Sequence, residues 1–274
     1  MDFYGYHFEY AGELSRKYGL IIANVTTDRN TLIAGKSKTV STYNKRNFTK
    51  YHIGTIYSDA PLTFEMEVVV TGEPIYGEWR RKIQKWLFNQ KDYQKLYIDK
   101  ADECTGEAFD LIDGLHRRMY LNCRFVNPEI IEGNGGIVGY RFEVECDSHM
   151  AKQDPTKKSF SFSGGLSTIQ HINVLVDTDH NDYIYPKVTI RVGKFGGNID
   201  LINHLDSDDR LTSFVELPAN TTLVLNGSVN YVSDNFYEEF VDRNFPRLLD
   251  GNNAISIIGD VLSIEFEWQN MRYL

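Results

Sequence analysis

The side chains best suited to hold a metal ion lie in the acidic loop at residues 177–182. Its sequence, Asp-Thr-Asp-His-Asn-Asp, places oxygens at the first, third and fifth positions, as a calcium loop does. Asp182 then stands where that loop requires glycine, and Val188 stands where it requires a bidentate glutamate. The run at 206–209 is a weaker version of this pattern. Solvated turns are the favoured interpretation of both loops, and we predict no metal site.

Groups that act as nucleophiles or as general acids and bases are scattered along the chain. The seven histidines, at positions 7, 52, 116, 149, 171, 180 and 204, show no metal-ligand spacing. Cys146 lies near His149, but it belongs to the apolar face of an alternating strand, where a buried thiol is expected. Glu143 and Glu145 fall on the polar face of the same strand. We therefore predict no catalytic residue and no cofactor.

The charges of the chain are distributed unevenly. The 274 residues carry 38 acidic and 29 basic side chains, a formal net charge of −9. Residues 1–160 hold 22 of each sign, so the rest of the chain holds 16 acidic and 7 basic side chains and accounts for the whole excess. This difference is a first indication of two domains.

The composition disfavours several classes of protein. No apolar run approaches the roughly 20 residues that span a bilayer, and the first residues show no signal-peptide pattern. A net-acidic chain without a basic block is a poor nucleic-acid binder, because that binding relies on cations neutralising phosphates. The cysteines at 104, 123 and 146 are odd in number and widely spaced, which favours reduced thiols in a protein that folds in the cytoplasm.

The elements that would position these side chains are mostly strands, with one helix. Helical periodicity is confined to the segment from Pro74, which suits a first turn, to about Asp92. Within it, one apolar stripe is formed by Trp79, Ile83, Trp86 and Leu87. We expect Trp79, Trp86 and Leu87 to dock this helix on a sheet.

Two alternating strands predict a long antiparallel hairpin over residues 118–147. Between them lies Asn134-Gly135, a dipeptide typical of hairpin turns because both residues tolerate positive φ. The first domain, residues 1–150, is therefore expected to be a sheet with one α-helix lying on it and a long β-hairpin.

The composition changes in the segment 151–167, which is rich in lysine, serine and glycine and predicts a linker. Residues 168–274 then contain about seven short strands separated by turns, one of them at Gly251-Asn252. Regular short strands of this kind predict a second domain that is an antiparallel β-sandwich.

Several blocks, in this order, resemble the distal tail protein (Dit) family of siphophages. The first half contributes an aromatic opening, a helix ending in Trp-Leu and a Tyr-x-x-Leu step, and the second half resembles the family's galectin-like domain. The matching blocks are Phe8–Ser15, Tyr18–Leu20, Arg81–Leu87, Tyr93–Leu96, Tyr185–Ile190, Gly197–Asn203 and Leu248–Ile255.

The resemblance implies a non-enzymatic structural role in the virion, after assembly in the host cytoplasm. By this resemblance the N-terminal domain is expected to be β-sandwich-like, with one helix and a protruding hairpin. Copies of it are expected to close into a homo-oligomeric ring, a hexamer in the family, with the galectin-like domain outside. Such a ring joins the tail tube protein to the tail-tip or baseplate hub protein, and its lumen passes DNA and the tape-measure protein. The exposed edges of the hairpin are candidates for the ring interface, because edge strands carry unpaired N–H and C=O groups.

An alternative function is carbohydrate binding by the second domain, for host-surface recognition. Lectin-like sandwiches bind sugars through an aromatic platform with polar neighbours, here Trp268, Tyr231 and Asn226. However, Trp268 continues a strand's apolar alternation, which favours a core position. A tail-associated hydrolase is a third hypothesis, for which the sequence offers no catalytic group.

Overall fold

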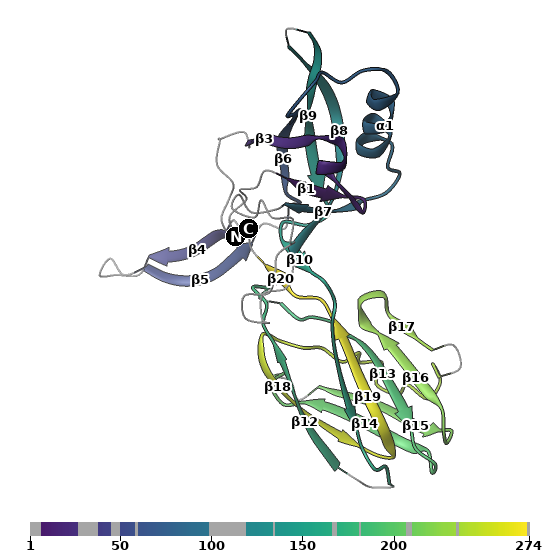
Figure 1. Cartoon of the computed structure of the whole chain (residues 1–274). Helices are drawn as coiled ribbons and strands as arrows, with labels where there is room; N and C mark the ends of the chain where they lie inside the picture. The colour runs from purple at the N-terminus through teal and green to yellow at the C-terminus, as the bar shows by residue number, and fades with distance from the viewer. Residues whose placement is uncertain are drawn as a thin grey trace. The chain divides into compact units, whose positions relative to one another are not determined.

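The computed structural model describes residues 7–26, 38–44, 50–57, 60–98, 119–133, 135–165, 169–180, 182–206, 210–233 and 236–272. The chain divides into two compact units, Met1–Gln153 with Arg272–Leu274, and Asp154–Met271. Antiparallel strands dominate both, and the described residues contain one α-helix (Figure 1). The prediction of a mainly β chain with two domains is confirmed. No helix in the described ranges is long and apolar enough to span a membrane.

The first unit is built on an antiparallel sheet with the strand order β2-β1-β7-β8-β9-β6-β3. Period-2 alternation explains why these segments are strands: in β6, Phe64, Met66 and Val68 are buried and the residues between them are more exposed. The strands are β1 (Phe8–Tyr10), β2 (Glu13–Leu14), β3 (Leu20–Thr26), β6 (Thr63–Val70), β7 (Gln94–Ile98), β8 (Met119–Gly133) and β9 (Gly136–Cys146), and a separate pair is formed by β4 (Lys38–Asn44) and β5 (Lys50–Tyr57).

Helix α1 (Gly77–Phe88) is shorter than the sequence predicts. It does not begin at Pro74, because the chain there is still extended: the N–H of Ile75 donates to the carbonyl of Ile137 in β9 at 2.7 Å. The helix also ends before Asp92. At this end Gln90 Nε2 donates to the Trp86 carbonyl at 2.8 Å and satisfies one of the last free carbonyls of the helix.

Strands β8 and β9 confirm the predicted long hairpin. Their register pairs Cys123 with Cys146 at the base and Gly133 with Gly136 next to the turn. The register shifts after Val126, where Asn127 adopts a φ of +51°. Such a bulge adds local twist to a strand pair.

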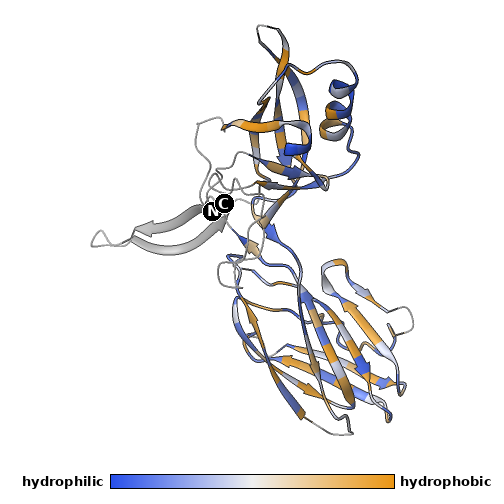
Figure 2. Ribbon diagram, in the orientation of Figure 1, coloured by the Kyte–Doolittle hydropathy of each residue, from blue (hydrophilic) through white to orange (hydrophobic). Residues whose placement is uncertain are grey.

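The second unit contains two sheets, ordered β11-β19-β13-β16-β17 and β12-β18-β14-β15. Their strands alternate hydrophobic and hydrophilic residues, visible as bands in Figure 2. The buried side chains of both sheets form one core, as in a β-sandwich. The strands are β12 (Ile169–Val176), β13 (Lys187–Val192), β14 (Gly197–Asn203), β15 (Leu211–Leu217), β16 (Thr222–Asn226), β17 (Tyr231–Val232), β18 (Gly251–Ile258) and β19 (Val261–Trp268).

The segment expected to be a linker, 151–167, contains two strands, β10 (Ala151–Gln153) and β11 (Thr156–Ser161). β10 pairs with β8 in the first unit, and β11 is the edge strand beside β19 in the second. β11 has one large apolar side chain, Phe160, packed against the core. Backbone pairing with β19, rather than its own hydrophobicity, makes this segment a strand.

Candidate functional site

Trp86 fixes helix α1 to the sheet of the first unit. Its ring is 5% exposed and stacks on the rings of Tyr18 and Phe8, with centroid distances of 4.5 and 5.6 Å. The indole N–H donates to the carbonyl of Tyr10 at 2.8 Å. A buried indole supplies a large apolar area but needs a partner for its one donor, and the site meets both requirements.

The other residues of the predicted stripe also face the core of this unit. Ile83 and Leu87 are fully buried, and Trp79 is partly buried against the same cluster. Four apolar residues at helical spacing therefore place one side of α1 on the sheet. Trp86 and Leu87 are buried, so they hold α1 in place but contribute no exposed surface to which a partner could bind.

The turn of the hairpin is tied to the segment before α1. Asn134 lies outside the described residues, whereas Gly135 is exposed and its carbonyl accepts a hydrogen bond from the Tyr76 hydroxyl at 2.9 Å. Gly136 has a φ of +138°, and a Cβ there would lie 3.3 Å from Pro74 and from Tyr76. The turn therefore favours glycine at position 136 for both conformation and space.

The distal half of β8 has one edge without a partner strand in the described parts of the chain. β7 pairs with β8 only at Leu121–Cys123, so from Arg124 to Gly133 its described partner strand is β9 alone. Pro128 and the bulge at Asn127 interrupt this edge, and beyond them Ile130 is 43% exposed. Proline and bulges limit uncontrolled pairing of an edge with another strand. Residues 129–133 of β8, which follow them, still offer an edge with which another strand could pair.

Ion pairs cross the hairpin and its neighbour. Arg124 Nη2 lies 2.6 Å from Glu145 Oε2, and Arg141 Nη2 lies 2.5 Å from Glu67 Oε1. All four side chains are at least partly exposed, so solvent screens both pairs and neither is a main source of stability. Their main consequence is that opposite charges cancel locally.

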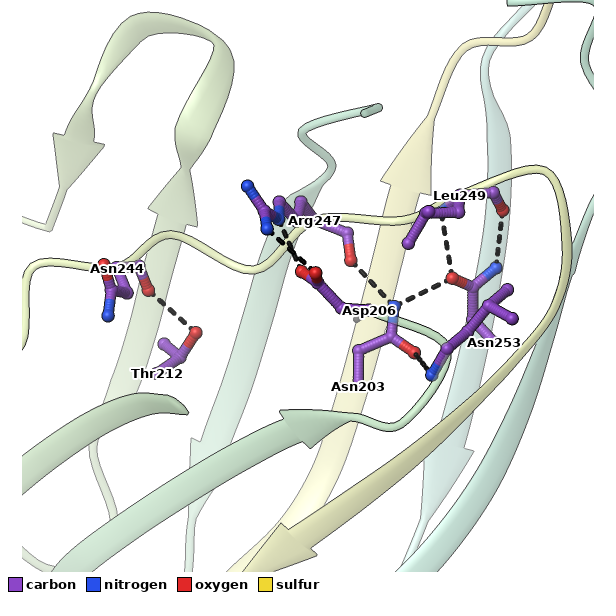
Figure 3. Close-up of polar contacts among 8 residues, drawn as sticks. Asn203, Asp206, Thr212, Asn244, Arg247, Leu249 and Asn253 are labelled. Carbon is purple, nitrogen blue, oxygen red and sulfur yellow. Dashed lines mark hydrogen bonds and ion pairs between the residues drawn. The ribbon is translucent and has the colours of Figure 1, made fainter. Parts of the chain in front are cut away.

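The turn before β18 is organised by Asn253, which the sequence does not single out. Gly251 has a φ of +103° and Asn252 is exposed, whereas Asn253 is fully buried. Asn253 Oδ1 accepts from the Leu249 N–H at 2.9 Å and from Asn203 Nδ2 at 2.8 Å. Its Nδ2 donates to the Leu249 carbonyl at 2.8 Å (Figure 3). One amide thus holds the turn in the conformation that starts the strand.

The same network contains a buried ion pair. Arg247 Nε and Nη2 donate to the two carboxylate oxygens of Asp206 at 2.5 and 2.8 Å, with side-chain exposures of 9% and 1% (Figure 3). The guanidinium also lies 3.5 Å from the ring centroid of Tyr183, and the Arg247 carbonyl accepts from Asn203. A paired, hydrogen-bonded charge of this kind fixes the loops of the sandwich.

The acidic loop is held by hydrogen bonds within the second unit. The Thr178 N–H donates to Asp250 Oδ1 at 2.9 Å, and the Thr178 hydroxyl donates to the Met271 carbonyl at 3.0 Å. Asn181 of the loop is outside the described residues. Elsewhere in the loop the structure gives a turn between β12 and β13. Within the described ranges, no three histidine, cysteine, aspartate or glutamate side chains are placed to share a metal ion.

A serine–histidine cluster that the sequence does not predict lies on the outer face of the β12-β18-β14-β15 sheet. Ser256 Oγ is 3.0 Å from His171 Nδ1 and 2.6 Å from His204 Nε2. The two imidazoles cover the hydroxyl, which leaves Ser256 only 4% exposed. Among the described residues no carboxylate orients either ring, so the cluster lacks the third member of a nucleophilic triad.

A cleft of about 410 Å³ lies in the second unit and is lined by residues of the proposed sugar platform. Tyr185, 37% exposed, and Asn226 line it, but Asn226 Oδ1 already accepts from the Ser228 hydroxyl at 2.7 Å. Trp268 is 5% exposed and its indole N–H donates to Asn270. A buried indole offers no stacking platform, so the structure does not favour the lectin alternative.

Comparisons with known proteins agree with the two-unit architecture. A family model described as phage tail protein N-terminal domain matches residues 3–148, and one described as phage tail C-terminal domain matches residues 155–268. No curated protein matches the chain.

The fold is shared with solved phage proteins at low sequence identity. The Dit protein of phage SPP1, described as a paradigm of the hub adsorption apparatus in phages that infect Gram-positive hosts, has a TM-score of 0.61 at 10% identity, covering 96% of this chain and 98% of that one. A chain of the phage p2 baseplate, in its activated conformation with Sr, has a TM-score of 0.50 at 12% identity, covering 96% and 97%. The expected resemblance to distal tail proteins is confirmed in the fold. The family matches cover both units in order, and the chain therefore belongs to a family of phage tail proteins.

Proposed function

We propose that the protein is a structural component of a phage tail, a distal tail protein of the baseplate hub. The observation that carries this proposal is that tail-protein families match both halves of the chain, in order, on a fold shared over 96% of its length with a hub protein. The protein acts without catalysis and is located in the virion after assembly in the host cytoplasm.

In this proposal the N-terminal units of several copies, six by analogy with the family, assemble head-to-tail into a closed ring. A heterologous interface that closes on itself produces a ring rather than a filament. The free edge of β8 from Glu129 to Gly133 supplies backbone groups for a neighbouring copy, and exposed Ile130 supplies apolar contact.

The ring joins the tail tube protein on one side to the tail-tip or baseplate hub protein on the other. Its lumen passes the tape-measure protein and the DNA, without sequence-specific recognition of bases. The second unit stays outside the ring, where its excess of acidic residues keeps it soluble and favours basic partner surfaces.

The test is the assembly state of the purified full-length protein, measured by light scattering and negative-stain microscopy with symmetry counted from class averages. We expect rings of the wild type at high concentration. Ile130→Lys should shift the population towards monomers, because it places a charge at the edge. The matched control Val229→Lys, at a 66% exposed position in the second unit, should assemble as the wild type does. A wild-type protein that stays monomeric contradicts the ring, and rings unchanged by Ile130→Lys contradict the β8 interface.

A further inference from the structure

Two of the three cysteines of the sequence face each other at the base of the hairpin. The register places Cys123 directly opposite Cys146. The next pair along, Asn122 and Asp147, is hydrogen-bonded, since the Asp147 N–H donates to the Asn122 carbonyl at 2.9 Å. Hydrogen-bonded and non-hydrogen-bonded pairs alternate in antiparallel strands, so the cysteines form a non-hydrogen-bonded pair.

A second hydrogen bond supports this assignment. The N–H of Cys146 donates to the carbonyl of Leu62 at 2.9 Å, so it points away from Cys123. In a non-hydrogen-bonded pair the Cα atoms are about 4.5 Å apart and the side chains lie on the same face. A disulfide spans Cα separations of roughly 4.4–6.8 Å. The register therefore places the two Cα atoms at a separation that a disulfide can span.

The surroundings explain why the reduced thiols are unreactive. Cys123 is 0% exposed and Cys146 is 3% exposed, both in the core of the first unit. Burial raises the pKa of the Cys123 thiol well above its ordinary value, and its contact with Cys146 raises that pKa further. Because the thiolate is the reacting species, oxidation in the folded state depends on local opening at the hairpin base.

We propose that Cys123 and Cys146 are a redox site that closes into an intramolecular disulfide when the protein meets a small oxidising disulfide. The thiolate of Cys146, the more exposed of the two, attacks the small disulfide and releases one small thiol. The thiolate of Cys123 then attacks the Cys146 sulfur and releases the second. The protein loses two electrons and two protons, and the small disulfide is reduced to two thiols.

The bond would close a loop over residues 124–145, which is the whole distal hairpin. In the reducing cytoplasm Cys123 and Cys146 stay as thiols, and outside the cell their disulfide links the two strands at the base of the hairpin. The inference goes beyond the proposed function and does not depend on it, because it rests on the register of β8 and β9 and on the backbone hydrogen bonds of Cys146 and Asp147.

The experiment treats the full-length Cys104→Ser variant, which retains only these two thiols, with oxidised and reduced glutathione in varying ratio. Free thiols are then trapped by alkylation in denaturant and the products analysed by intact mass and peptide mapping. We expect a loss of 2 Da, a Cys123–Cys146 cross-linked peptide, reversal by dithiothreitol, and a rise of about 5–10 °C in the unfolding midpoint of the first unit. Wild-type protein treated in parallel should give the same cross-linked peptide.

Cys146→Ser provides the matched control, which should show neither the 2 Da loss nor the rise in the midpoint. The proposal is overturned if both thiols stay reduced in oxidising buffer while the chain is folded, or if stable glutathione adducts form without the cross-link. Ring assembly is measured separately, so a negative result here leaves the proposed function standing.

Discussion

Replacement of Asn253 is the sharpest test of how the second unit is held together. Asn253 is fully buried and bonds both the N–H and the carbonyl of Leu249, together with the side chain of Asn203. Weaker contacts at 3.2 Å reach the carbonyls of Val174 and Gly251. Asn253→Ala removes this amide and leaves its partners without replacements in the core.

The magnitude follows from the groups left unpaired. A buried polar group without a partner costs about 1–3 kcal/mol, and Leu249 loses partners for its N–H and its carbonyl, both only partly buried and so towards the lower end of that range. Asn203 retains the Arg247 carbonyl as an acceptor at 2.9 Å, so its loss is smaller. We expect Asn253→Ala to lower the free energy of unfolding of this unit by about 3–4 kcal/mol. For a unit of this size that corresponds to a midpoint lowered by about 10–15 °C.

Asn253→Asp separates hydrogen bonding from packing, since its size is unchanged. It keeps the acceptor for the Leu249 N–H but sets a carboxylate against the Leu249 carbonyl. That contact disfavours the charged form in the folded state and raises the pKa of the new carboxyl, so the destabilisation is present above its unfolded pKa and is relieved as the pH falls. The wild type has no such group at this position.

Scanning calorimetry of the full-length variants and hydrogen exchange at the Leu249 amide measure the effect. Asn252→Ala is the control, because Asn252 is exposed and its side chain makes one contact of 3.5 Å, with Asn173. If Asn253→Ala unfolds within about 1 kcal/mol of that control, the amide is not the organiser of the turn and the reasoning fails.

Three further changes test the first unit. Trp86→Phe removes the indole donor to Tyr10 and should cost about 1–3 kcal/mol in urea unfolding, and a loss below 0.5 kcal/mol would contradict the docking argument. Hydrogen bonds from Tyr18 and then Lys17 lower the pKa of the Glu13 carboxyl. The stability that this carboxylate adds is therefore present above the ordinary carboxyl pKa and is lost as the pH falls through the lower folded pKa. In unfolding titrations, Glu13→Gln should lose less stability than wild type between neutral and acid pH. A Cβ at Gly139 would overlap the Val68 carbonyl in β6, so Gly139→Ala should reduce soluble, cooperatively unfolding protein, and the same change at exposed Gly135 should not.

Periodicity predicts those parts of the fold that depend on which face of an element is buried. The stripe from Trp79 to Leu87 and the alternation of β8 and β9 are properties of neighbouring residues, so both appear in the sequence. The start of α1 is not predicted, because Ile75 forms a β-bridge with Ile137, which is 62 positions away in the sequence. Strand β11 is missed for a related reason, since its pairing with β19 is decided by tertiary structure.

The side chains that organise the second unit are harder to predict. Asn252 and Asn253 are neighbours of the same type, and although alternation places Asn253 on the face of Ile255 and Ile257, nothing local says what would satisfy an amide buried there. The difference lies in distant partners, Asn203 in β14 and Val174 in β12. The serine–histidine cluster on Ser256 likewise joins β18, β12 and the turn after β14, and has no spacing in the sequence that would reveal it. Turn chemistry identifies Gly251, whose φ of +103° favours glycine, but not the amide that holds it.

The charge balance of the first 160 residues acquires a structural meaning from the hairpin. Residues 1–160 carry 22 acidic and 22 basic side chains, and some of these opposite charges are also paired in space. Arg124 and Arg141 each form an ion pair with a carboxylate on a neighbouring strand. Cancellation over a few ångströms leaves little field at the distance of an approaching copy, particularly at physiological salt, where screening acts within about 8 Å. In the proposed ring, contacts at the β8 edge would then depend on backbone pairing and on Ile130 rather than on charge. The second unit carries the net excess of acidic side chains, so in the proposed assembly long-range attraction or repulsion would arise mainly there.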